Sequence, residues 1–277
     1  MRRFPSTDGV EVAAYDLGGA GPPLLLAHAT GFHAHVFVPL AERLAGRFHC
    51  FAFDERGHGE TSVPDGLDYD WHRFADDALA VARGLELDRP FAFGHSAGGA
   101  ALLLAEAADP GRFRALYCYE PVVMPVDPPL GPQENILSEG ARRRRAVFAS
   151  RDEAYANYAA KAPFAVLAPA ALRAYVDFGF ADQPDGTVRL RCPPEVEAEI
   201  YRMGSAHDAF SRMAEVRCPV AVVCGEHTDA FTPPLVERQV AALAHGRMEV
   251  LPDLGHFGPL EDPGAVAESV LRAFALA

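Results

Sequence analysis

Ser96 lies at the centre of residues 94–98, which read Gly-His-Ser-Ala-Gly and have a glycine two residues before and two residues after the serine. The segment follows the apolar run Pro90–Phe93 and precedes an alanine-rich stretch that predicts a helix. On a sharp strand-to-helix turn a serine hydroxyl is exposed and held still, as a nucleophile for a carbonyl carbon requires. Gly94 and Gly98 would let the chain pass close to its neighbours there. The same five residues could form a coincidental turn, so their setting decides between the two interpretations.

Short apolar runs alternate with helical patterns along the chain. This alternation predicts a mostly parallel α/β sheet with helices on both faces. The segment from Glu11 to Leu17, between two turn signals, is expected to be an antiparallel entry strand. The expected parallel strands are Leu24–Ala27, His49–Phe53, Phe91–Phe93, Ala115–Tyr119, Val220–Cys224 and Met248–Leu251.

Residues able to do chemistry follow these strands. Reactive groups in open parallel sheets gather beyond the carboxyl ends of the strands, so these residues are expected at one edge. In chain order they are His28–Phe32, Asp54–Gly59, Ser96, Glu120, Gly225–Asp229 and Gly255–Phe257.

Over essentially its whole length, the chain resembles the α/β-hydrolase superfamily. The resemblance rests on GHSAGG at 94–99, on DERGHGETS at 54–62, and on the late residues Asp229 and His256. In that family a catalytic triad runs in the order serine, acid, histidine, which Ser96, Asp229 and His256 keep. The resemblance implies an α/β-hydrolase sheet flanked by helices.

The chemistry gives each residue of the expected triad a role. His256 would take the proton of Ser96 as the hydroxyl attacks and return it to the leaving group. Asp229 would fix the tautomer of His256 and stabilise its imidazolium form. Glu120 is the alternative acid, because some family members place the acid after the preceding strand, and Glu226 is a third candidate.

A tetrahedral intermediate needs donors aimed at its developing negative charge. The backbone N–H of Ala97 and that of Thr30 are the expected oxyanion-hole donors, with Gly31 able to replace Thr30. Both expected donors act through the backbone. His28, in the same loop as Thr30, is expected to be an internal hydrogen-bonding residue rather than a base.

The alternation of apolar runs and helical patterns stops between about Pro121 and Arg217, where several prolines lead into helical segments. We expect a helical cap over residues 121–215, inserted after the strand that ends near Tyr119, and a hydrolase core formed by residues 1–120 and 216–277. Most of the aromatic side chains of the cap are expected to form its own core, and a minority to face a ligand.

Some members of the α/β-hydrolase superfamily use an aspartate as the nucleophile at the strand-to-helix turn. Ser96 occupies that turn here, so the reactions of those members are not expected. The favoured function is hydrolysis of a small to medium apolar carboxylic ester or lactone through an acyl-enzyme. Thioester or amide cleavage, carbon–carbon bond hydrolysis of diketone-type substrates and perhydrolase activity use the same triad, so motifs do not separate them. A ligand-binding protein without turnover is the alternative of another class.

The composition of the chain limits the classes of binding partner that we expect. A formal net charge of −13 argues against nucleic acid or an anionic membrane surface. The basic run Arg142–Arg145 is expected to be a solvated helix face, although it could draw anionic substrates towards a nearby cleft. Neither a zinc pattern nor a phosphate-binding glycine loop occurs, so no metal and no cofactor are expected. Without a signal-like start we expect a soluble cytoplasmic protein, as a monomer or homodimer.

Overall fold

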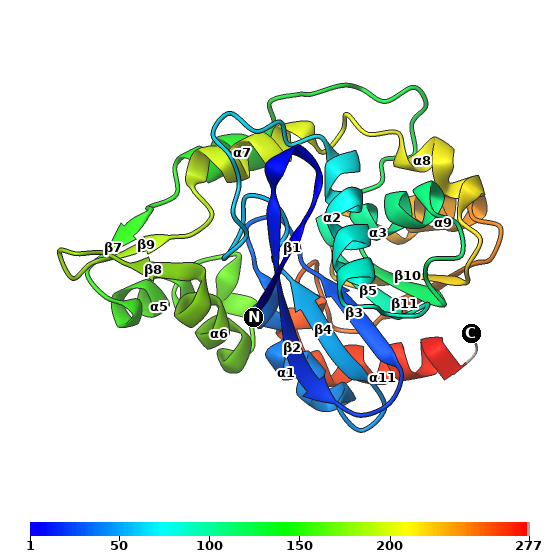
Figure 1. Cartoon of the computed structure of the whole chain (residues 1–277), viewed down its shortest axis with the longest axis horizontal. Helices are drawn as coiled ribbons and strands as arrows, with labels where there is room; N and C mark the ends of the chain where they lie inside the picture. Colours follow the sequence, from blue (N-terminus) through cyan, green and yellow to red (C-terminus); the bar gives the residue numbers. More distant parts are fainter. Residues whose placement is uncertain (276–277) are drawn as a thin grey trace.

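The computed structural model describes residues 1–275, and its centre is an eight-stranded sheet in the order β1-β2-β4-β3-β5-β6-β10-β11 (Figure 1). The first two strands pair antiparallel and the remaining six run parallel. The expected α/β sheet is therefore confirmed, and strand β1 is an addition to the expected set. The strands are β1 (Arg2–Pro5), β2 (Glu11–Gly19), β3 (Pro23–Ala27), β4 (His49–Phe53), β5 (Phe91–His95), β6 (Ala115–Tyr119), β10 (Val220–Gly225) and β11 (Gly246–Leu251).

The order of the strands reverses at β3, because the chain continues from β3 to β4 on one side and later places β5 on the other. The loops that leave β3 and β5 therefore diverge, and they open a crevice at the carboxyl edge of the sheet. Ala27 at the end of β3 pairs with Gly94 in β5. This register brings the loop at Thr30 next to the turn at Ser96.

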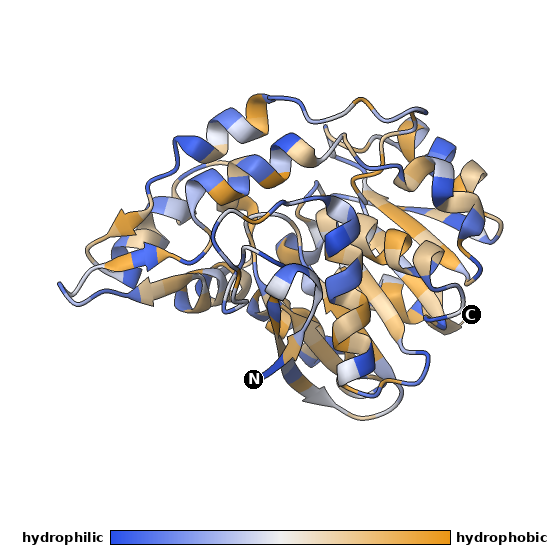
Figure 2. Cartoon of the chain, turned by 45° about the horizontal axis from the view of Figure 1, so that its top comes forward, coloured by the Kyte–Doolittle hydropathy of each residue, from blue (hydrophilic) through white to orange (hydrophobic). Residues whose placement is uncertain are grey.

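Helices cover both faces of the sheet, as alternation along the strands requires. In β3, Leu24 and Leu26 pack into a cluster with α1 and α11, whereas Leu25 packs on the opposite face with α2 and α3. Figure 2 shows the hydrophobic strands sandwiched between helices whose outer faces are polar. The core helices are α1 (Val38–Leu44), α2 (Trp71–Gly84), α3 (Ala97–Ala108), α9 (Pro233–Ala242), α10 (Gly258–Glu261) and α11 (Pro263–Ala275).

The segment between β6 and β10 forms a separate group of elements, on the left and top of Figure 1. It contains a small antiparallel sheet in the order β7-β9-β8 as well as helices, so the expectation of a purely helical insertion was incomplete. Strands of two or three residues are too short to show alternation in a sequence. The elements are α4 (Ile136–Arg142), β7 (Val147–Phe148), α5 (Arg151–Ala159), α6 (Pro169–Gly179), β8 (Phe180–Asp182), β9 (Val188–Leu190), α7 (Pro194–Met203) and α8 (Ala209–Arg212).

Aromatic packing joins this insertion to the sheet. The ring of Phe32, in the loop after β3, lies 5.6 Å from Phe164, 5.3 Å from Tyr175 and 5.6 Å from Phe257. Phe164 and Tyr175 come from the insertion; Tyr175 belongs to the hydrophobic cluster that contains α1 and α11, and Phe164 packs against it. The aromatic residues of the insertion therefore continue the main core instead of forming a core of their own.

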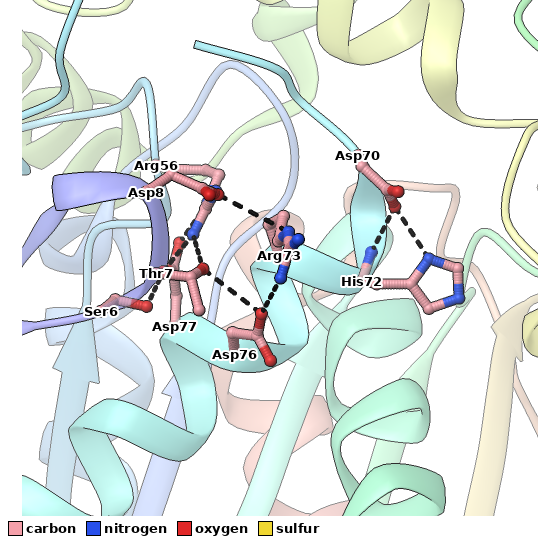
Figure 3. A network of polar contacts seen from close by, with 9 residues as sticks. All are labelled: Ser6, Thr7, Asp8, Arg56, Asp70, His72, Arg73, Asp76 and Asp77. Carbon is pink, nitrogen blue, oxygen red and sulfur yellow. Dashed lines mark hydrogen bonds and ion pairs between the residues drawn. The ribbon is translucent and has the colours of Figure 1, made fainter.

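A network of polar contacts fixes the segment after β4 to helix α2 and the N-terminal loop (Figure 3). The Arg56 guanidinium donates from Nε to Asp77 Oδ2 at 2.8 Å and from Nη2 to Asp77 Oδ1 at 2.7 Å. Neither side chain is exposed to solvent. Arg56 also donates to Asp8 and to Thr7, which belong to the N-terminal loop.

We expect Asp77→Ala to destabilise the fold by about 3–5 kcal/mol, because it leaves the Arg56 charge buried without its main partner. Equilibrium unfolding in urea measures this loss. Asp76→Ala is the matched control, since Asp76 pairs with the half-exposed Arg73 and such pairs contribute less than about 1 kcal/mol. Equal losses in the two variants would contradict a structural role for the buried pair.

The turn between β5 and α3 depends on close backbone approach at Gly98. A Cβ at this position would lie 2.4 Å from the carbonyl oxygen of Ala27 and 2.7 Å from that of His28. The Gly98 N–H donates to the His28 carbonyl at 3.0 Å. The helix therefore starts in direct contact with the end of β3.

We expect Gly98→Ala to destabilise the fold by about 1–3 kcal/mol, because backbone atoms must move to make room for the methyl group. Thermal and urea unfolding measure the change. Gly46→Ala is the control, since Gly46 is exposed and its added Cβ meets no atom within 4 Å, so a change within about 0.5 kcal/mol is expected. A Gly98→Ala protein as stable as the control would show that the turn tolerates a side chain.

Candidate active site

Ser96 stands in a strained turn between β5 and α3. Its backbone has φ 55° and ψ −111°, a conformation that residues other than glycine rarely adopt. Two neighbouring groups hold this conformation: the Ser96 N–H donates to the Tyr119 carbonyl at 2.9 Å, and the Ser96 carbonyl accepts from Val122 N–H at 3.1 Å. The hydroxyl forms no hydrogen bond with any residue from 1 to 275, so its lone pairs and proton are available.

His256 lies beside this turn, in the loop between β11 and α10. Nε2 of His95, the residue before Ser96, donates to the backbone carbonyl of His256 at 2.9 Å, and the centroids of the two rings are 5.2 Å apart. The hydroxyl of Tyr119 donates to the carbonyl of Gly255 at 2.7 Å. Two side chains from the ends of β5 and β6 therefore hold the backbone of the His256 loop.

The acid that contacts His256 is Glu120. The His256 Nδ1 lies 2.6 Å from Glu120 Oε2, and the carboxylate has no solvent exposure. Glu120 also has a positive φ of 45°, directly after β6. Its Oε1 accepts from Gly225 N–H at 2.9 Å and its Oε2 accepts from the Thr228 hydroxyl at 2.8 Å. The carboxylate, which follows β6, is therefore fixed by groups from the end of β10, from the turn after β10 and from the His256 loop.

Asp229, the acid favoured from the sequence, does not reach His256. Its side chain is exposed and makes no hydrogen bond or ion pair with the described residues. The segment after β10 instead turns Thr228 inward, where its hydroxyl meets Glu120 and also accepts from Ala230 N–H at 3.2 Å. Glu226, the third candidate, is exposed and accepts from Asp253 N–H at 3.3 Å. The expectation that Asp229 orients His256 is corrected by this geometry.

Two unpaired backbone donors flank the Ser96 turn. The N–H groups of Ala97, at the start of α3, and of Thr30, after β3, have no acceptor within residues 1–275. The Gly31 N–H donates to Nε2 of His58 at 2.9 Å, so it is not available to replace Thr30. The sequence favoured Thr30 and kept Gly31 as its replacement, and in the structure His58 occupies the Gly31 N–H and leaves that of Thr30 unpaired.

His28, Glu55 and His58 form a buried cluster whose ligand-type atoms lie within 4.8 Å of one another. Both rings already use both nitrogens. Nδ1 of His28 lies 2.8 Å from the Ala29 carbonyl, and Nε2 accepts from the Glu55 N–H at 3.0 Å. His58 does the same with the Arg56 carbonyl and the Gly31 N–H. These histidines therefore hold loops through neutral rings, as expected for His28, and offer no free lone pair to a metal ion.

A cavity of about 380 Å³ lies between the insertion and the sheet edge. It reaches the site at Thr30 and at Phe257, the residue after His256. Most of its wall is apolar, and its polar side chains include Arg144, Tyr158 and Glu197. A cavity of this size suits a small organic molecule.

Sequence reasoning missed His95 and Tyr119, which position the His256 loop. Both adjoin residues that it did single out, because His95 precedes Ser96 and Tyr119 precedes Glu120. No pattern in the sequence indicates that their side chains point towards a loop about 140–160 residues later. Their proximity to Ser96 and Glu120 is the signal that could have directed attention to them.

Comparison with known proteins places this arrangement in a family. A 2-(acetamidomethylene)succinate hydrolase of Mesorhizobium japonicum is 35% identical over 98 residues, which cover 35% of this chain and 35% of that protein. The match thus spans about a third of that relative. A putative non-heme bromoperoxidase of Mycobacterium tuberculosis is 25% identical over 287 residues, covering 95% of this chain and 97% of the other.

Solved structures agree with the fold. The crystal structure of an E-2-(acetamidomethylene)succinate hydrolase matches with a TM-score of 0.82 at 22% identity, over 99% of this chain and 98% of that one. Within residues 1–275, every helix is too short or too polar to cross a membrane. The model of the alpha/beta hydrolase family matches residues 24–269. This chain belongs to the alpha/beta hydrolase family.

Proposed function

We propose that this protein is a serine hydrolase that cleaves a small to medium carboxylic ester or lactone through an acyl-enzyme. The observation that carries the proposal is the buried Glu120–His256 hydrogen bond beside the strained Ser96 turn. A carboxylate, an imidazole and a free hydroxyl at neighbouring strand ends are the three groups that nucleophilic acyl transfer needs.

The proposed mechanism follows from the tautomer of His256. A carboxylate at Nδ1 holds a proton on that nitrogen, so Nε2 carries a lone pair. As Ser96 Oγ bonds to the substrate carbonyl carbon, its proton passes to Nε2. The tetrahedral intermediate then expels the alkoxide, which takes this proton and leaves as the alcohol. Water repeats the sequence on the acyl-enzyme and releases the acid.

Thr30 and Ala97 would bind the oxygen that becomes negative in both steps. Their N–H groups are unpaired, and that of Ala97 also lies at the positive end of the α3 dipole. A free hydroxyl and two free donors favour turnover over the alternative of a ligand-binding protein. Ester or lactone hydrolysis is preferred to carbon–carbon bond cleavage or perhydrolysis because it needs least beyond these groups.

We expect Glu120→Gln to lower kcat by about 10³- to 10⁴-fold, because an amide in that position no longer stabilises the imidazolium form of His256. Steady-state hydrolysis of p-nitrophenyl butyrate measures the effect. Asp229→Asn is the matched control, since the same change on an exposed side chain should alter kcat less than threefold. If Asp229→Asn is the crippling change, the acid is misassigned here.

Covalent labelling tests the nucleophile independently of the substrate. A fluorophosphonate probe should label the wild-type protein once, and intact-mass analysis should show no adduct on Ser96→Ala. Ser211 is an exposed residue of helix α8, and Ser211→Ala should label like the wild type. A folded wild-type protein that resists the probe would support the ligand-binding alternative.

A substrate panel narrows the reaction class. We expect p-nitrophenyl esters of two to six carbons and a small lactone to be hydrolysed, and a vinylogous diketone to be left intact. Turnover of the diketone alone would replace ester hydrolysis with carbon–carbon bond cleavage.

A further inference from the structure

The basic run at residues 142–145 divides between the surface and the cavity. Helix α4 ends at Arg142, so the run is not a continuous helix face. Arg142 pairs with Glu134 at 2.6 Å and Arg145 pairs with Glu153 at 2.8 Å, both on the outside. Arg144 turns inward instead, where its side chain is 15% exposed and lines the cavity next to Thr30.

The guanidinium of Arg144 is held on one side and open on the other. Nη1 donates to Glu197, and Nη2 donates to the hydroxyls of Tyr158, at 3.0 Å, and of Tyr175. A guanidinium has five N–H groups. These bonds use three of the five, and the Nε–H and the second Nη1–H have no acceptor among the residues that the structure describes.

Tyr158 adds a third donor at the same place. Its hydroxyl accepts from Arg144 and lines the cavity, but its own hydrogen has no acceptor in the described part of the chain. Tyr158 is mostly buried and lines the cavity wall. Together, Arg144 and Tyr158 offer three donors, which is the pattern that a carboxylate binds. The carboxylate of Glu197, on the same wall, accepts from Nη1 of Arg144.

The net charge of the cavity wall is opposite to that of a carboxylate. Its charged residues are Arg144, Lys161 and Glu197, so the wall carries one net positive charge. This contrasts with the net charge of −13 for the whole chain. A buried arginine–glutamate pair contributes little net stability compared with apolar residues, so stability does not explain its presence at this wall.

Arg144 lies close to the loop that carries Thr30. A Cβ at Gly31 would lie 2.6 Å from Glu197 Oε1 and 3.5 Å from Arg144 Nη1. Gly31 follows Thr30, one of the two proposed oxyanion donors. A group bound to Arg144 would therefore lie only a few bonds from a carbonyl held at the Thr30 N–H.

We propose that the substrate carries a carboxylate a few bonds from the scissile carbonyl, and that Arg144 and Tyr158 bind this carboxylate. This inference rests on the proposed hydrolase function and names its substrate class: monoesters of short dicarboxylic acids, or lactones with a carboxylate. It replaces the wholly apolar substrate expected from the sequence.

The test compares mono-p-nitrophenyl glutarate with the neutral p-nitrophenyl pentanoate. We expect wild-type kcat/KM to favour the anionic ester by at least about tenfold. Arg144→Gln should lower kcat/KM for the anionic ester by about 10- to 100-fold and change that for the neutral ester less than threefold. Arg145→Gln, on the outward neighbour, should leave both values unchanged. Equal loss on both esters, or a wild-type preference for the neutral one, would overturn the proposal.

Arg144→Gln leaves the Glu197 carboxylate buried without its partner, so this variant could lose activity because it misfolds. A second variant controls for that outcome. Arg144→Gln combined with Glu197→Gln removes both charges and should show the same selective loss. Its melting temperature and circular dichroism establish that it is folded.

Binding separates this inference from the proposed function. Glutarate should bind Ser96→Ala in calorimetry, and at least tenfold more weakly when Arg144→Gln is added. If glutarate binds through Arg144 but no ester is hydrolysed, the proposed function fails and the carboxylate site stands. If esters are hydrolysed but glutarate does not bind, the carboxylate site fails alone.

Discussion

The arrangement of the site depends on one buried hydrogen bond, between Glu120 Oε2 and Nδ1 of His256. A carboxylate without solvent exposure is costly unless its lone pairs are used, and here Gly225, Thr228 and His256 use them. Gly225 ends β10, Thr228 lies in the turn that follows, and His256 lies in the loop after β11, so satisfying the carboxylate also fixes the ends of β6 and β10 relative to the His256 loop. The strained φ angles of Ser96 and Glu120 persist in this setting because hydrogen bonds to neighbouring strands determine both backbones.

Two buried arginines in this chain show how the same chemistry serves different ends. The Arg56 side chain has no exposed surface. It donates four hydrogen bonds, to Asp77, Asp8 and Thr7. Arg144 donates three hydrogen bonds, and its remaining N–H groups lie at a cavity wall beside the proposed oxyanion hole. Both are paired with a buried carboxylate, which satisfies the charge. The difference that matters for function is therefore the set of donors left over, not the ion pair itself.

Local patterns in the sequence predicted the sheet and the Ser96 turn, because apolar runs of five or six residues and a glycine-flanked serine have local physical causes. They did not predict β7, β8 and β9, whose two or three residues carry no periodicity. The choice between Asp229 and Glu120 depended on which of two loops turns inward, and Thr228 occupies the inward position that Asp229 would need. Arg144 is one of four identical residues in a row, so only the end of α4 and the position of the cavity distinguish it.

The histidines around the site show why His256 is suited to carry a proton. Burial lowers the pKa of His58 to about 4, and that of His95 to about 3, so both stay neutral at physiological pH. Burial likewise lowers the pKa of His28 well below its ordinary value. Each of the three forms hydrogen bonds with backbone groups, which fix its tautomer. His256 differs by having the Glu120 carboxylate at Nδ1. In the proposed mechanism, a proton that leaves Ser96 therefore meets the one imidazole that has a carboxylate at Nδ1, while the neutral rings keep the loops, and with them the Thr30 N–H, in place.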